Sequence, residues 1–322
     1  MNNQTLKDAT WIITDGRAGM LNQCQGLAEA VGLPIESRIV KPVWPWTLLP
    51  VTLWPFPFLS LGSGSTRFEP PWPRLAIGCG WRSIPFLIEI KRRSGDRTMT
   101  VQLQDPRVPT DVFDLVVPPE HDGLTGDNVV PIIGSPNRIN AANLETAAKR
   151  WQALVQAYPS PRIAVLVGGR SKAHRFTKAD AAALGDQLRD LLHQGFSLMV
   201  TTSRRTGEEQ TQILRDALNA KHAFLWDGTG DNPLLGMLAH ADAILVTSDS
   251  TNMMVEAAGT GKPVHILKLA SSNPKFDRLV DKLTELGVAR LFKGRIENWT
   301  YEPLNETARI ADLIRGKLVN FR

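Results

Sequence analysis

Hydrophobic and polar residues follow a repeating order along this chain: a short apolar run, a turn of small residues, and then an amphipathic stretch. The segment 243–266, AILVTSDSTNMMVEAAGTGKPVHI, shows this order most clearly. Ala243–Val246 is typical of a buried parallel strand, and residues 247–251 form a turn rich in side-chain oxygens. A helix is predicted to follow and to end at Gly259, before another strand at Val264–Leu267.

The same order recurs on both sides of this segment. Further strands are predicted at Thr10–Thr14, Ile35–Val40, Arg74–Gly80, Thr98–Gln104, Phe113–Val117, Val129–Ile132, Ile163–Val167, Phe196–Thr201, Ala223–Trp226 and Ala289–Phe292. Further helices are predicted at Asn22–Val31, Trp81–Lys91, Asn140–Tyr158, Lys178–Gln194, Glu208–Leu218, Leu234–His240, Asn273–Leu286 and Glu306–Leu318. This alternation indicates an α/β fold with parallel sheets. Because Pro159-Ser160-Pro161 is typical of a linker, we predict domains over 1–158 and 159–300, and a C-terminal helix within 301–322 that packs back on the first domain.

One segment, 42–66, departs from the pattern. It contains five prolines and no charged residue, and a membrane-spanning helix is excluded because the prolines would interrupt its backbone hydrogen bonds. Two interpretations stay open: a buried crossover, or an apolar loop at a membrane interface, where tryptophan is favoured. In the second, the membrane-facing residues are Trp44, Trp46, Trp54, Phe56 and Phe58. Nearby cations that could meet anionic lipid are Lys41, Arg67, Arg74, Arg92 and Arg93.

Composition and charge narrow the class of protein. Hydrophobic residues make up 43% of the 322 residues and charged residues 21%, as in soluble globular proteins. The net charge of +5 suits phosphorylated ligands or an anionic membrane, but no Lys/Arg run is dense enough to predict nucleic-acid binding. Cys24 and Cys79 have neither a CxxC nor a metal-ligand spacing, which favours a reducing cytoplasm and no metal site. The N-terminal sequence predicts no signal peptide.

Three predicted strand–helix turns in the second half, at 168–172, 202–207 and 247–251, are rich in glycine, hydroxyl groups and arginine. Parallel strands place their carboxyl ends at one edge, so these turns should converge around an anion near a helix N-terminus. The candidate donor-binding residues are Gly168, Gly169, Arg170, Ser203, Arg204, Ser248, Asp249, Ser250, Thr251 and Asn252. Within this set, Gly169, Ser203, Arg204, Ser250 and Thr251 would hold the diphosphate. Glu256 is placed to accept hydrogen bonds from a ribose diol. The alternative is that Ser250 or Thr251 only caps the helix and that Glu256 is solvated.

The first half offers two further turns. Asp15-Gly16-Arg17-Ala18-Gly19 follows the first strand and either cradles a ligand or is a plain tight turn. Gln104-Asp105-Pro106-Arg107 follows a later strand, where ligands bind in open parallel sheets; the alternative is a proline turn with a surface ion pair. The candidate catalytic bases are Asp15 and Asp105. The candidate acceptor-binding residues are Gly16, Gly19, Asn22, Gln23 and Arg107.

Four stretches, TDGRAGMLNQCQGLAEAVG at 14–32, QDPR at 104–107, FDLVVPPEHDG at 113–123 and VTSDSTNMMVEAAGTGKPV at 246–264, resemble the mitochondrial fission ELM family. The resemblance covers nearly the whole chain. It implies a GT-B-like fold, in which two Rossmann-like domains face each other across a cleft and the C-terminal one binds the nucleotide-sugar donor. The functional analogue is the peptidoglycan N-acetylglucosaminyltransferase, which acts on a membrane lipid. Its glycine-rich loop carries a histidine where this chain has Met20, while its ribose-binding glutamate matches Glu256.

These features predict a metal-independent glycosyltransferase that needs no cofactor and takes a nucleotide-diphosphate sugar as co-substrate. Its acceptor would be lipid-linked, in cell-envelope glycan or lipopolysaccharide synthesis, at the inner face of the cytoplasmic membrane. The alternative is a non-catalytic scaffold that recruits a protein partner to a membrane, since plant members of the family are implicated in recruiting a dynamin-related GTPase. An NAD-dependent epimerase is disfavoured, because it needs a Tyr-x-x-x-Lys pair, and the two tyrosines are followed at that spacing by Arg162 and Asn305.

Overall fold

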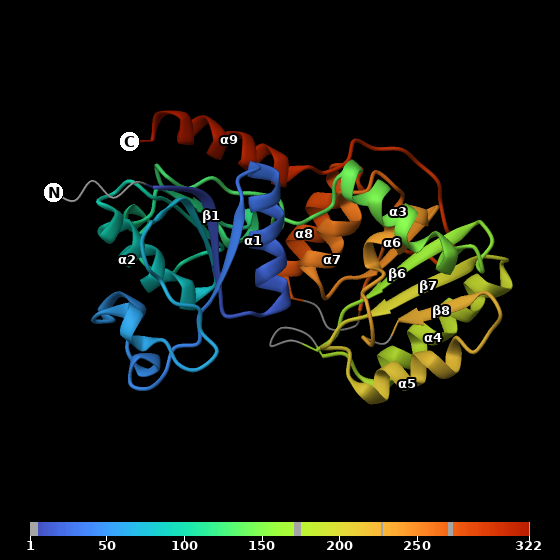
Figure 1. Ribbon diagram of the computed structural model, residues 1–322. Helices are drawn as coiled ribbons and strands as arrows, with labels where there is room; N and C mark the ends of the chain where they lie inside the picture. The colour runs from blue at the N-terminus through green and yellow to red at the C-terminus, as the bar shows by residue number, and fades with distance from the viewer. Residues whose placement is uncertain (1–5, 171–174, 227, 270–272, 322) are drawn as a thin grey trace. The chain divides into compact units, whose positions relative to one another are not determined.

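The computed structural model describes residues 6–170, 175–226, 228–269 and 273–321. The chain divides into two compact units (Figure 1). The N-terminal unit comprises Met1–Arg138 and Asn305–Arg322, and the C-terminal unit comprises Ile139–Leu304. Each unit is an α/β structure built around its own parallel sheet, as the alternating sequence pattern predicts.

The N-terminal unit holds a five-stranded sheet in the order β2-β1-β3-β4-β5. Its strands are β1 (Lys7–Thr14), β2 (Ile35–Ile39), β3 (Pro73–Cys79), β4 (Met99–Leu103) and β5 (Leu115–Val117), and its α-helices are α1 (Ala18–Val31), α2 (Ile84–Ser94) and α9 (Glu306–Asn320). Side chains alternate across β1, so Ile12 joins α1 and α9 in one core while Trp11 and Ile13 join α2 in another. The strand order reverses between β1 and β3, which is where such sheets bind ligands.

The C-terminal unit holds a six-stranded sheet in the order β11-β10-β9-β6-β7-β8. Its strands are β6 (Arg162–Val167), β7 (Ser197–Thr202), β8 (Ala223–Trp226), β9 (Ala243–Thr247), β10 (Val264–Leu267) and β11 (Ala289–Leu291). Its helices are α3 (Ala141–Val155), α4 (Lys178–His193), α5 (Glu208–Ala217), α6 (Leu234–His240), α7 (Thr251–Ala258) and α8 (Pro274–Glu285). This is the doubly wound Rossmann order, and its switch point lies between β6 and β9.

Two predicted elements differ in the structure. Residues 129–132 form only isolated bridges, Val129 with Val116 and Ile132 with Pro119, instead of a strand. Pro131 explains this, because it has no N–H to donate to a ladder. Helix α1 begins at Ala18, four residues before the predicted start, so Gly19 lies in its first turn and not in a loop.

The proline-rich segment 42–66 folds into three short 3-10 turns, at Trp46–Leu48, Val51–Leu53 and Pro57–Ser60. The prediction that all five of its aromatic residues face a membrane is wrong for Trp54, which is buried, while Phe58 is half-buried. The Trp54 ring is buried, edge-on to Phe86 at 6.3 Å, and Phe58 stacks on Phe68 at 5.1 Å between ring centroids.

Trp46 is half-buried, and its indole N–H donates to the carbonyl of Pro55 at 2.8 Å. Trp44 and Phe56 are exposed. The segment is therefore neither a wholly buried crossover nor a wholly exposed loop. Across the described ranges, no helix is long and apolar enough to cross a membrane.

Two helical glycines of the N-terminal unit give a matched stability test. A Cβ built on Gly26 of α1 would lie 2.4 Å from the backbone oxygen of Asn137, whereas a Cβ on Gly316 of α9 would meet no atom within 4 Å. We expect Gly26→Ala to lower the free energy of unfolding by about 2 kcal/mol through overpacking. Gly316→Ala should raise it by about 0.5–1 kcal/mol through helix propensity. Urea unfolding followed by circular dichroism measures both, and equal effects would contradict the packing.

His265 of β10 gives a pH-dependent prediction. Its side chain is buried, with Nε2 accepting the Glu297 N–H at 3.2 Å and the ring edge-on to Trp299. Burial lowers the pKa of His265 below its usual value of 6.5. The unfolded chain therefore binds the proton first as the pH falls through 6.5, and the native state loses stability.

His265→Gln should remove this dependence because a glutamine does not titrate. We expect the difference in unfolding free energy between wild type and variant to change between pH 7.5 and 5.5, by at most about 1.4 kcal/mol per pH unit for one proton. Urea unfolding at a series of pH values measures it. Parallel stability curves for the two proteins would show that folding leaves the pKa of His265 unchanged, which contradicts its burial.

Candidate functional site

The turns after β6, β7 and β9 come together at the switch point of the C-terminal sheet. A Cβ built on Gly168 would lie 2.4 Å from both carboxylate oxygens of Asp249. A Cβ on Gly169 would lie 2.2 Å from the backbone carbonyl carbon of Arg205. Only glycine therefore fits at these two positions, and the turn after β6 is enclosed by the other two.

Hydrogen bonds join the same three turns. The Gly168 N–H donates to Thr247 Oγ1 at 2.8 Å, and the Gly169 N–H donates to Asp249 Oδ2. The Ser203 hydroxyl donates to the Gly168 carbonyl at 3.0 Å. The predicted convergence of the turns is therefore present, but these predicted donor-binding residues are engaged in holding the protein itself.

Ser248 has the same internal role, because its Oγ accepts the Leu269 N–H at 3.2 Å. Its hydroxyl fixes the chain after the neighbouring strand. Ser250 is buried at the N-cap of α7 and makes no side-chain capping bond. Thr251 and Asn252, in the first turn of α7, are half-buried.

Asp249 is the most unusual group of the site. It is 1% exposed, and its Oδ1 accepts no hydrogen bond from the residues that the structure describes. A buried carboxylate oxygen without a donor is costly, so this atom is the group of the site whose environment most needs an explanation. Glu256, further along α7, is 8% exposed, so a ribose contact would use only the small accessible part of its side chain.

Three arginines add positive charge at this edge. Arg170 follows β6, and Arg204 and Arg205 follow β7; all three are exposed. Within the described parts of the chain, none of them forms an ion pair. Arg205 was not singled out from the sequence, although its position in the 202–207 turn gave the signal. Ser171 and Lys172, which also belong to the first predicted turn, lie outside the described residues.

Asp15 lies at the switch point of the N-terminal sheet, directly after β1. Its side chain is 5% exposed and contacts Arg17 Nε at 3.3 Å and Arg82 Nη1 at 3.7 Å. Gly16 has a left-handed φ of +83°, which only glycine adopts readily. Arg82 was missed from the sequence, although its place just after the β3 turn gave the signal. Its guanidinium lies over the Trp81 ring at 5.2 Å.

The turn after β4 is strained. Gln104 and Arg107 have φ values of +70° and +56°, a region that non-glycine residues rarely occupy and that often marks functional sites. The Arg107 N–H donates to Asp105 Oδ1 at 2.8 Å. Asp105 is half-buried, and Arg107 is exposed. Gln104 Nε2 donates to Gln23 Oε1 at 3.1 Å, so the structure brings α1 and this turn together.

The remaining predicted residues line the start of α1. Gly19 is exposed and Asn22 is half-buried. Met20, at the position of the analogue's histidine, packs on Gly80: a Cβ there would lie 2.8 Å from its sulfur. In the described residues, no three His, Cys, Asp or Glu side chains gather as a metal site.

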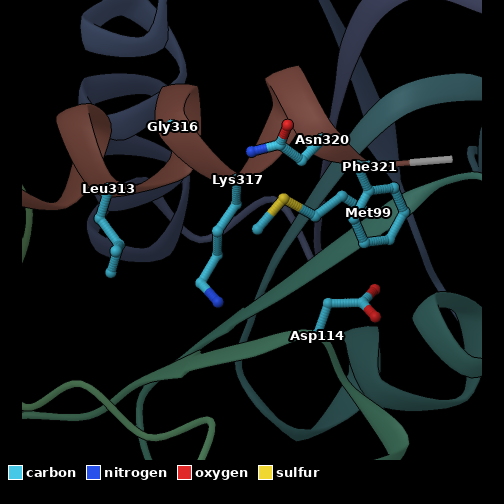
Figure 2. Close-up of a pocket in the computed structure, with 7 residues that line it drawn as sticks. All are labelled: Met99, Asp114, Leu313, Gly316, Lys317, Asn320 and Phe321. Carbon is cyan, nitrogen blue, oxygen red and sulfur yellow. The ribbon is translucent and has the colours of Figure 1, made fainter.

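A hollow of about 580 Å³ lies elsewhere in the N-terminal unit (Figure 2). It is lined by Met99, Asp114, Leu313, Gly316, Lys317, Asn320 and Phe321. Met99 begins β4 and Asp114 precedes β5, so the hollow lies at the amino ends of these strands, opposite the edge where ligands bind. The Asp114 carboxylate is already bound by Lys91 Nζ at 2.7 Å and by the Thr100 N–H at 2.8 Å. The hollow contains none of the predicted site residues.

Two parallel α/β units with these strand orders define a GT-B-like protein, as the sequence predicted. The UDP-GlcNAc 2-epimerase from Methanocaldococcus jannaschii shares the fold with a TM-score of 0.56 and 13% identity, over 95% of this chain and 99% of that chain. Os79 from O. sativa in complex with UDP has a TM-score of 0.51 and 12% identity, over 97% and 94%. At these identities the similarity concerns the fold alone.

The chain belongs to the mitochondrial fission ELM1 family, whose family model matches residues 18–318, and this confirms the predicted resemblance. The "Mitochondrial fission protein ELM1" of Arabidopsis thaliana is 32% identical over 279 residues, which are 78% of this chain and 65% of the relative. The chain thus spans about two thirds of that protein. "Uncharacterized protein RP120" of Rickettsia prowazekii is 28% identical over 294 residues, 76% of this chain and 80% of the relative.

Thr206 tests how far the converging turns depend on internal hydrogen bonds. Its buried Oγ1 accepts the Ser203 N–H at 2.9 Å and donates to the Gly168 carbonyl. Thr206→Val keeps the shape and should lower the free energy of unfolding by about 1–3 kcal/mol, because these two backbone groups lose a buried partner. Thr211→Val is the matched control: its hydroxyl bonds Gly207 at 2.7 Å on the exposed face of α5, and we expect a change within about 0.5 kcal/mol. Indistinguishable urea unfolding of the two variants would contradict this account.

Proposed function

We propose that this protein is a metal-independent glycosyltransferase that moves a sugar from a nucleotide-diphosphate sugar to an acceptor. The observation that carries the proposal is the edge of the C-terminal sheet. Three features follow strands that end together at this edge. They are the Asp249 oxygen without a donor, the start of α7 without a side-chain cap, and the exposed Arg170, Arg204 and Arg205. Sugar nucleotides offer hydroxyl donors and a diphosphate, which match these groups.

The diphosphate of the donor would be bound by the exposed arginines and the start of α7. Arg170 and Arg204 would form ion pairs with the negatively charged diphosphate. The partial positive charge at the N-terminus of α7, at Thr251, would also stabilise it. Asp249 Oδ1 would accept a hydroxyl or N–H of the nucleotide sugar, and the accessible part of Glu256 would accept from the ribose. The backbone N–H of Gly169 and the hydroxyl of Ser203 would position this edge instead of touching phosphate.

In the transfer step, the bond between the sugar carbon and the diphosphate oxygen breaks, and the acceptor oxygen forms the new bond to that carbon. Arginine guanidinium groups and the α7 dipole would stabilise the charge on the leaving diphosphate. A carboxylate of the N-terminal unit would take the acceptor's proton. Asp105 suits this role better than Asp15, because Asp15 is paired with Arg17 and Arg82, whereas the half-buried Asp105 forms no ion pair with the residues that the structure describes.

The acceptor would contact Gly16, Gly19, Asn22, Gln23 and Arg107. We propose a lipid-linked acceptor in cell-envelope glycan or lipopolysaccharide synthesis, used at the inner face of the cytoplasmic membrane. Fold neighbours support the class of donor: the M. jannaschii epimerase has been crystallised in complex with UDP-GlcNAc and UDP, at a TM-score of 0.55, and Os79 in complex with UDP. We infer that this chain uses a nucleotide sugar from the shared fold and from the groups at the edge of the C-terminal sheet.

Nucleotide binding tests the proposal. We expect one of UDP, GDP, ADP and CMP to raise the melting temperature, by an amount that EDTA leaves unchanged. A ligand at 100 times its Kd adds about 2.7 kcal/mol to stability, which thermal shift detects. Asp249→Asn should weaken this binding roughly tenfold or more, because an amide alters the acceptor and its charge.

Asp216→Asn on the exposed face of α5 is the matched control and should bind as wild type does. Arg170→Gln with Arg204→Gln should also weaken binding while leaving the melting temperature without nucleotide unchanged. If no nucleotide stabilises the wild type, the protein is not a transferase of this kind, and the scaffold alternative takes its place.

A further inference from the structure

An apolar surface protrudes from the N-terminal unit at residues 43–59, which we call the apolar lobe. Seven large hydrophobic side chains of the lobe are between 39% and 75% exposed: Val43, Trp44, Leu48, Leu49, Leu53, Phe56 and Leu59. In Figure 1 the lobe forms the light-blue turns that extend below the sheet, away from β1. Large hydrophobic side chains exposed in such number within one short segment favour an interaction site.

The lobe has a fixed shape. Trp54 is its buried anchor, with its ring edge-on to Trp81 at 6.4 Å and to Phe86 at 6.3 Å. Phe58 is the second anchor and stacks on Phe68. Between these anchors, Phe56 has a left-handed φ of +49°, which is strained for a phenylalanine, yet its side chain is 66% exposed. The fold thus accepts backbone strain while leaving an aromatic ring in solvent.

The lobe bonds part of its own backbone. The N–H groups of Leu48, Leu49, Leu53 and Leu59 donate to carbonyls three residues earlier, at 2.8–3.0 Å. The indole N–H groups of Trp46 and Trp54 donate to Pro55 and Leu49 carbonyls at 2.8 and 3.1 Å. The five prolines of the segment have no N–H at all. These bonds hold the short turns that carry the exposed apolar side chains, and such a surface suits the interfacial region of a membrane.

Cations border the lobe. The Arg93 guanidinium lies over the Phe58 ring at 4.7 Å, and Arg82 lies over Trp81, which is itself 44% exposed. Lys41 and Arg67 flank the segment on its two sides and are exposed. Neither Lys41 nor Arg67 forms an ion pair with the residues that the structure describes. Their positive charge complements anionic lipid headgroups.

We propose that the apolar lobe inserts into the interface of an anionic membrane, with Leu48, Leu53, Phe56 and Leu59 among the acyl chains and the bordering cations at the headgroups. A lipid surface is the partner that fits, because exposed cations stand beside the exposed apolar side chains, as anionic headgroups stand beside acyl chains. The insertion does not depend on sugar transfer.

Vesicle flotation tests the insertion. Wild type should bind vesicles of phosphatidylcholine with about 30% phosphatidylglycerol, in the absence of nucleotide, and bind pure phosphatidylcholine more weakly. Leu48→Gln, Leu53→Gln and Leu59→Gln combined should lower the partition coefficient on the order of tenfold or more, because three exposed leucines lose their burial. Arg93→Gln with Lys41→Gln should reduce the preference for phosphatidylglycerol.

Val319→Gln is the matched control, because Val319 is an exposed hydrophobic residue, 81% exposed, on α9 of the same unit; its binding should stay within twofold of wild type. Failure of wild type to float, or flotation of the triple variant at the wild-type level, would overturn the proposal. Concentration-dependent self-association that is lost in the triple variant, without vesicle binding, would also overturn it and assign the lobe to a protein contact. Nucleotide-induced thermal shifts of the triple variant should equal those of wild type, so failure of insertion and failure of nucleotide binding are distinguishable.

Discussion

The C-terminal unit depends on the close approach of one turn to two others. Gly168 and Gly169 lie so near Asp249 and the 205–206 backbone that a single added Cβ would overlap them. This contact holds the carboxyl ends of β6, β7 and β9 at one edge and buries the Asp249 carboxylate, with one oxygen bound by Gly169 and the other without a donor among the described residues. Because an unpaired buried acceptor is costly, this oxygen is the feature on which the proposed sugar-nucleotide site depends.

The N-terminal unit carries one aspartate in each of two turns at the carboxyl ends of its strands. Its switch point carries Asp15, whose charge is compensated by Arg17 and Arg82, and the next turn carries Asp105 between two residues with left-handed backbones. One carboxylate is thus fixed by ion pairs, and the other is half-exposed in a strained turn.

The sequence predicted the two sheets, because apolar runs and glycine positions are local signals. It also predicted the convergence of the turns, because parallel strands end at the same edge of a sheet. It was not sufficient for the partners of individual groups. The hydroxyls of Ser203 and Ser248 bind carbonyl and amide groups distant in the chain, so no local pattern distinguishes them from ligand contacts. Hydrophobicity does not distinguish Trp54 from Trp44 either: Trp54 is buried because its ring meets Phe86 of α2, whereas Trp44 is exposed.

A crystal structure with the nucleoside diphosphate that stabilises the protein tests the account most directly. It should show diphosphate oxygens within hydrogen-bond distance of the α7 N-terminus and of Arg170 or Arg204, and a ligand donor on Asp249 Oδ1. A nucleotide bound at another place, with that oxygen still lacking a donor, would contradict the assignment of this edge as the sugar-nucleotide site.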